Sequence, residues 1–112
     1  MDLIVEELPN GVTKAKLSGR MDIDGASKVD MRFNVLAGAK KSLVVDLSGV
    51  SFMASMGLRT LMTTARTMSS RGGKMALANP QDSVAKVLQT SGVGEVIAVH
   101  ASLDDAIAAV QA

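Results

Sequence analysis

The first third of the chain passes from apolar segments with strand spacing to a segment with helical spacing. Residues 3–8 and 12–17 have strand character and are joined by Pro9-Asn10-Gly11. Asn-Gly between two such segments predicts a β-hairpin. A polar turn follows, with two aspartates suited to capping a helix, Asp22 and Asp24. The helix itself is predicted by apolar residues at helical spacing, Ala26, Val29, Phe33 and Leu36.

The middle of the chain predicts a buried strand and then an amphipathic helix. Residues 43–47 form a nearly continuous apolar run, typical of a strand covered on both faces, so we expect the central strand of a sheet here. The helix that follows has an apolar face made of Leu58, Leu61, Met62, Ala65 and Met68. Its polar face consists of Arg59, Thr60, Thr63, Arg66 and Thr67.

The last third of the chain repeats the alternation. Residues 75–78 predict a strand, and Asn79-Pro80 predicts a cap with proline in the first helical position. Residues 96–99 predict a last strand. Ser102, with Asp105 three residues later, resembles a capping box that opens a final helix.

The element order is therefore β-β-α-β-α-β-α-β-α. Strands that alternate with helices require parallel pairs, whereas the initial hairpin is antiparallel, so the order predicts an α/β fold with a mixed sheet of about five strands. The chain has 112 residues, of which 47% are apolar. This is enough for one core and too little for two, so we expect a single domain over residues 1–112.

The charge balance argues against nucleic acid and membranes as partners. Twelve basic and 11 acidic residues give a formal net charge of +1, which is too small to attract phosphate backbones or anionic lipids. No apolar run approaches the roughly 18 residues needed to span a bilayer, and no basic segment precedes an apolar one at the start of the chain. We therefore expect a soluble, cytoplasmic protein.

Candidate catalytic groups are sparse. The chain has no cysteine and one histidine, His100, so it offers no thiolate and no histidine-based metal site. Gly72-Gly73 lacks the lysine-serine ending of a phosphate-binding loop. Asp46 ends a strand, where it is better placed to bond to nearby backbone than to act as an acid or base. We expect no enzyme activity, no metal and no cofactor.

Ser55 stands where the buried strand region passes into the second helix. It precedes Met56, Gly57 and the apolar stripe that begins at Leu58, so it lies at or within a residue of the helix N-cap. Because serine is a preferred cap in any helix, capping alone would explain it. The alternative interpretation is a functional hydroxyl.

The segment Val44 to Leu61, VVDLSGVSFMASMGLRTL, resembles the signature of the STAS domain, as found in bacterial anti-sigma-factor antagonists. That signature has an apolar strand ending in Asp-Leu, then a Phe, then Asp-Ser, a small residue and Gly-Leu. Length and element order agree from end to end. The matching residues are Asp46-Leu47, Phe52, Ser55 and Gly57-Leu58, and Gly19 followed by Asp22 looks like the family's Gly-x-x-Asp turn.

The resemblance implies partner switching in bacterial signalling. In that family the unmodified antagonist binds an anti-sigma factor that is also a serine kinase. Phosphorylation of the signature serine ends the complex, and a serine phosphatase restores it. Ser55 is the phosphoacceptor that matches, and the regulated output is transcription or another switched process. A second copy of the chain, in a homodimer, is a further candidate partner.

Two residues beside Ser55 depart from the pattern. Ala54 stands where the family has Asp, and Met56 takes a position usually held by a small residue. With Met53 they make the turn more apolar, which favours a contact surface if the methionines are exposed and a packing role if they point inward. The departures also favour a second interpretation, a STAS scaffold subunit of a larger signalling or lipid-transport complex in which Ser55 only caps its helix.

We expect the partner-binding surface to combine Ser55 with the turn before the first helix and the exposed face of the second. In an open α/β sheet these loops project beyond the carboxyl ends of the parallel strands. For any one arginine or threonine of that helix, an ordinary solvated face is the alternative. The predicted surface consists of Arg20, Met21, Asp22, Ile23, Met53, Ala54, Ser55, Met56, Gly57, Arg59, Thr60 and Thr63.

Overall fold

The computed structural model describes residues 1–111 and contains the predicted elements in the predicted order. A short 3-10 helix, η1, is added before the last strand. The elements are β1 (Asp2–Glu7), β2 (Thr13–Met21), α1 (Ile23–Ala39), β3 (Ser42–Met53), α2 (Ser55–Ser70), β4 (Lys74–Ala78), α3 (Asp82–Ser91), η1 (Val93–Glu95), β5 (Ala98–His100) and α4 (Leu103–Gln111).

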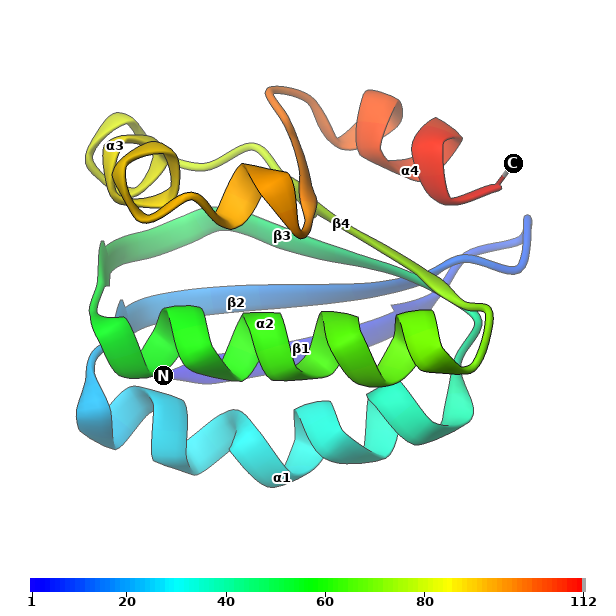
Figure 1. The fold of residues 1–112 in the computed structure, drawn as a ribbon, viewed down its shortest axis with the longest axis horizontal. Coiled ribbons are helices and arrows are strands. Elements are labelled where there is room, and N and C mark those ends of the chain that lie inside the picture. Colours follow the sequence, from blue (N-terminus) through cyan, green and yellow to red (C-terminus); the bar gives the residue numbers. More distant parts are fainter. Residues whose placement is uncertain (112) are drawn as a thin grey trace.

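The strands form one mixed sheet in the order β1-β2-β3-β4-β5. The hairpin pair β1–β2 is antiparallel and the other pairs are parallel. Helices α1 and α2 cover one face of the sheet, and α3, η1 and α4 cover the other (Figure 1). The predicted α/β class, the mixed five-stranded sheet and the central place of residues 43–47 are therefore confirmed.

The main core joins the sheet to α1 and α2 on one face and reaches Val84 and Leu88 of α3 on the other. The predicted stripe of α1 is buried throughout, and Phe33 is completely enclosed. Leu61 and Met68 bury α2 against the same core. A smaller cluster on the opposite face joins Val44 of β3 to Ala106 and Val110 of α4. The predicted apolar stripes of α1 and α2 are therefore the sides that pack against the sheet, as expected for amphipathic helices.

Two strands extend further than the sequence suggested. β3 runs to Met53, and β2 runs through Arg20 and Met21, which we had expected in a turn. The pairing is interrupted by register shifts, after which Arg20 lies opposite Phe52 and Met21 opposite Met53. The bulged pairing lets both strands continue to the point where α1 and α2 begin.

The predicted start of α3 is wrong by a few residues. The helix begins at Asp82 with Gln81 as its N-cap, and Asn79 has a left-handed backbone with a φ of 53°. The last strand is also shorter than predicted, since Ile97 packs into the core ahead of β5. Ser102 caps α4 as predicted, because the Asp105 N–H donates to Ser102 Oγ at 3.2 Å, which is one of the two hydrogen bonds of a capping box.

Candidate functional site

The site lies at the end of the sheet where β2 passes into α1 and β3 passes into α2. The Ala54 N–H donates to the carbonyl oxygen of Met21 at 2.9 Å, which ties the two strand-to-helix junctions together. Asp22 is the N-cap of α1, and its carboxylate accepts from the Gly25 N–H at 2.8 Å. Asp22, and not Asp24, is therefore the cap. Both junctions follow directly on the paired ends of β2 and β3, and this pairing fixes their positions relative to each other.

Ser55 is the first residue of α2 and is exposed to solvent. The N-cap is Ala54, which has no side-chain oxygen, and no side chain caps this helix. The interpretation of Ser55 as a capping serine is therefore wrong. The first hydrogen bond at this end of the helix runs from the Leu58 N–H to the Ala54 carbonyl at 3.1 Å. The N–H groups of residues 55–57 precede it, and such groups have no partner within a helix.

Gly57 lets the start of α2 lie directly on two methionines. A Cβ at this position would overlap Met21 Cγ and would lie 2.7 Å from Met53 Sδ. Met21 is fully buried and Met53 is 3% exposed. We had placed all three residues in the partner-binding surface, and this is corrected: they are covered, and they support the surface from beneath.

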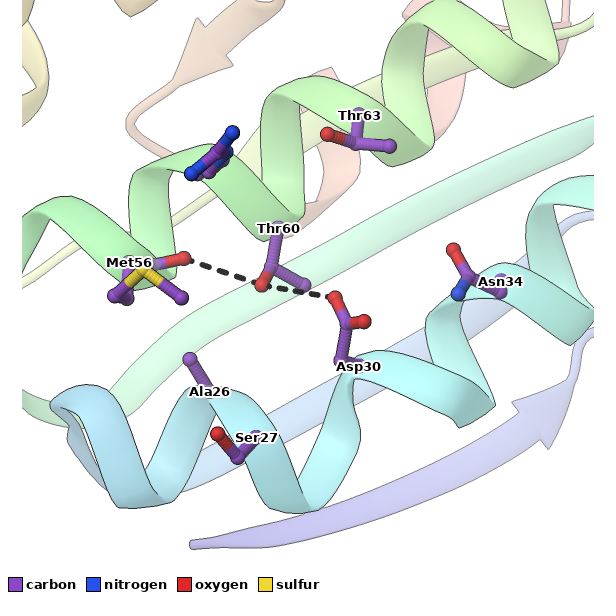
Figure 2. A pocket seen from close by; sticks show the side chains of 8 residues that line it. Ala26, Ser27, Asp30, Asn34, Met56, Thr60 and Thr63 are labelled. Carbon is purple, nitrogen blue, oxygen red and sulfur yellow. Dashed lines mark hydrogen bonds between the residues drawn. The ribbon is translucent and has the colours of Figure 1, made fainter.

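A groove of about 410 Å³ lies between α1 and α2, and its lining includes Met56, the residue after Ser55. Figure 2 shows the polar groups of Asp30, Asn34 and Thr63 along it, with Met56 at one end. Arg59 and Thr63 are exposed, as predicted, and Met56 is 38% exposed. The groove is lined by Ala26, Ser27, Asp30, Asn34, Met56, Arg59, Thr60 and Thr63.

Thr60 forms the floor of the groove and does not belong to the exposed face of α2. It is 5% exposed, and its hydroxyl lies 3.2 Å from Asp30 Oδ1 and 3.1 Å from the Met56 carbonyl oxygen. Packing of α1 against α2 covers this side chain. The prediction that Thr60 contacts a partner directly is therefore corrected.

Arg20 and Phe52 form a stacked pair beside Ser55 that the sequence did not reveal. The guanidinium carbon of Arg20 lies 4.3 Å from the centre of the Phe52 ring, and its Nε lies 3.6 Å from Asp22 Oδ2. The hydrogen bond from Gly25, and then the charge of Arg20, lower the pKa of the Asp22 carboxyl from its usual 3.8. Phe52 is 39% exposed. Its neighbour Ser51 is exposed too, so burial at this end of β3 does not follow period-two alternation and the sequence carried no such signal for Phe52.

Comparison with known proteins identifies the family. The family model described as the STAS domain matches residues 4–106. A relative from Paenibacillus polymyxa, named anti-sigma F factor antagonist, is 26% identical over 103 residues, covering 89% of this chain and 88% of the relative.

Solved structures show the same fold. An anti-sigma factor antagonist from Mycobacterium paratuberculosis is 27% identical, with a TM-score of 0.89 over 99% of this chain and 94% of that one. The phosphorylated form of the Bacillus cell fate determinant SpoIIAA is 23% identical, with a TM-score of 0.73 over 97% of this chain and 99% of that one. Within residues 1–111, no helix has the length and apolar character needed to cross a membrane.

Proposed function

The chain belongs to the STAS domain family, and we propose that it is an anti-sigma-factor antagonist that acts by partner switching in the bacterial cytoplasm. With Ser55 unmodified, it binds an anti-sigma factor that is also a serine kinase. Phosphorylation of Ser55 releases that partner, and a serine phosphatase restores the complex. The observation that carries the proposal is the exposed hydroxyl of Ser55 at the start of α2, which no capping role occupies.

The chemistry is supplied by the partner. The kinase would take the proton from the Ser55 hydroxyl, and the serine oxygen would form a bond to the γ-phosphorus of ATP while the bond from that phosphorus to the β-phosphate oxygen breaks. ADP leaves, and the phosphatase later transfers the phosphoryl group to water. The antagonist itself contributes only an accessible hydroxyl, and it needs no cofactor.

The modification is expected to leave the fold intact. A phosphoserine carries about −1.5 to −2 charges at pH 7, and the start of a helix favours negative charge because of its unpaired N–H groups and its dipole. Ser55 lies on the outside of the domain, so the phosphate stays in water. Its cost falls on the complex, where a surface fitted to a neutral hydroxyl would have to accept a desolvated dianion.

The exposed and half-buried residues around Ser55 form the proposed contact surface, which we call the switch surface. Its apolar members are Ile23, Phe52 and Met56, which are 65%, 39% and 38% exposed. Three large apolar side chains in water at one edge of a small domain favour a protein contact. The other members are Arg20, Asp22, Ala54, Ser55, Arg59 and Thr63.

Phosphate transfer tests the proposal directly. The protein is incubated with candidate anti-sigma-factor kinases and ATP, and its mass is measured intact. Wild type should gain one phosphate and Ser55→Ala none. Ser51→Ala is the matched control, because Ser51 is an exposed serine at the end of β3, and it should gain one phosphate as wild type does. Equal phosphate on Ser55→Ala and wild type would remove Ser55 from its role.

Binding tests the second half of the proposal. Ser55→Asp should bind the same kinase more weakly than wild type. A complex that moves from nanomolar to micromolar affinity has lost about 4 kcal/mol, and an aspartate with one charge should lose part of that. If Ser55→Asp binds as tightly as wild type, the switch does not lie at this residue.

A constitutive scaffold is the second candidate function. It is favoured by Ala54, since this position carries no carboxylate to orient Ser55 or to assist a kinase. In this case the domain would be a permanent subunit of a larger signalling or lipid-transport complex. No kinase would modify Ser55, and Ser55→Asp would leave the assembly unchanged, so the two experiments above separate the candidates.

A further inference from the structure

Helix α2 is cationic along the side that presents Ser55. Its sequence, SMGLRTLMTTARTMSS, contains Arg59 and Arg66 and no acidic residue. Both arginines are exposed. Arg59 is four residues after Ser55, so the two side chains lie on the same side of the helix with their Cβ atoms about 5–6 Å apart. Arg66 lies on the same side but eleven residues away, about 16 Å along the axis.

Arg59 is not engaged by any acidic side chain among residues 1–111. The ion pairs of that part of the chain join Lys14 to Glu6, Arg20 to Asp22 and Lys40 to Glu7. Arg20, the other cation of the switch surface, is therefore already held by Asp22 and by the Phe52 ring. Arg59 is the cation near Ser55 whose guanidinium is available.

We propose that Arg59 binds the phosphate of phosphorylated Ser55 and holds it against the side of α2. The inference rests on the proposed function, and it adds the residue that binds the phosphate after Ser55 has been modified. A guanidinium presents two parallel N–H groups that match two phosphate oxygens. An anion placed four residues before a cation is also the favourable orientation on a helix, because it agrees with the helix dipole.

The neighbouring acidic side chains compete little with the phosphate for Arg59. Asp30 of α1 lines the same groove as Arg59 and is the acidic group that competes for it, yet its Oδ1 already accepts from Thr60 in one of the two arrangements of that hydroxyl. Asp22 is paired with Arg20. Ala54 stands directly before Ser55, so no carboxylate repels the phosphate from that side. The pairing would withdraw Arg59 from any partner as the phosphate is added.

The titration of the phosphate tests the pairing. Phosphoserine is encoded genetically at position 55 of the full chain, and the ³¹P signal is followed between pH 4.5 and 8. The second pKa of phosphoserine is about 6, and a nearby guanidinium lowers it by favouring the dianion. Arg59→Gln should raise the midpoint by about 0.4 pH unit. Arg59→Lys keeps the positive charge but lacks the two parallel N–H groups of the guanidinium, so it should raise the midpoint by less.

Arg66→Gln is the matched control. It removes the same charge from the same side of α2, but at a distance beyond the screening length of about 8–10 Å at moderate salt, so its midpoint should stay within about 0.1 pH unit of wild type. A difference of about 0.2 pH unit or more between the two glutamine variants supports the pairing, and a smaller difference overturns it. Because the phosphate is installed without a kinase, this result is independent of whether a kinase recognises Ser55.

Discussion

Gly57→Ala should destabilise the domain, although alanine is the better helix former. The added methyl group would overlap Met21 Cγ and would lie 2.7 Å from Met53 Sδ and 3.1 Å from the Met21 carbonyl oxygen. Sδ belongs to the flexible part of Met53 and can move, but Cγ is near the base of a fully buried side chain. Relief therefore requires α2 to lift away from the ends of β2 and β3.

The magnitude follows from two opposing terms. Overpacking of a tightly filled site costs about 1–3 kcal/mol, and replacing glycine by alanine inside a helix returns up to about 1 kcal/mol. The first turn of α2 should return less than a helix interior, so the free energy of unfolding should fall by about 1–2 kcal/mol. For a domain of this size that is a decrease in Tm of about 5–10 °C.

Gly38→Ala is the matched control for this substitution. Gly38 also lies in a helix, α1, and a Cβ there would meet no atom within 4 Å. It should stabilise the domain by up to about 1 kcal/mol. Urea unfolding of both variants measures the difference. If Gly57→Ala unfolds at the same or a higher urea concentration than Gly38→Ala, the tight contact between α2 and the two methionines is refuted.

Two further predictions concern the helix ends. The pKa of Asp22 is lowered from its usual 3.8, so its ionised carboxylate stabilises the fold above that pH, and this contribution is lost as the pH falls through the lower folded value. Urea unfolding between pH 6 and 2.5 should therefore show a smaller loss of stability for Asp22→Asn than for wild type. An equal loss would contradict the role of Asp22 as an ionised cap. Arg71 Nη1 donates to the Ala37 carbonyl at 2.7 Å and to the Lys40 carbonyl at 3.2 Å, so Arg71→Ala should lower the free energy of unfolding by about 1 kcal/mol. Arg66 makes no such contact within residues 1–111, so Arg66→Ala should change the urea midpoint little.

The fold was predictable because its patterns are long and consistent. The stripe Ala26, Val29, Phe33 and Leu36 repeats over several turns, and all of it is buried. The apolar run at residues 43–47 lies in the central strand of the sheet, where helices cover both faces (Figure 1). In each case many side chains gain from one placement, so local errors do not change the result.

The details of the site were less predictable, because they depend on contacts between distant segments. A polar residue on the polar face of an amphipathic helix is expected to be exposed. Thr60 is nevertheless covered, because α1 packs beside it and Asp30 Oδ1 lies within hydrogen-bond distance of its hydroxyl. The direction of Met21 and Met53 depends on the register of β2 with β3 beyond the irregular pairing. Ser55 lies one residue after the N-cap, Ala54, which is within the predicted range, but the sequence could not tell these two positions apart because helix boundaries are uncertain by a residue or two.

This one-residue difference matters for the proposed switch. The oxygen of a serine at the N-cap would accept a hydrogen bond from a backbone N–H of the first turn, and phosphorylating that serine would remove the cap from α2. At the first position of the helix, Ser55 is outside that role, and Ala54 is fixed by its bond to Met21 at the end of two paired strands. A phosphate added there meets a rigid junction and not a mobile loop, so the surface beneath it has little freedom to rearrange around a bound partner. The domain should then keep its fold, and the partner has to leave.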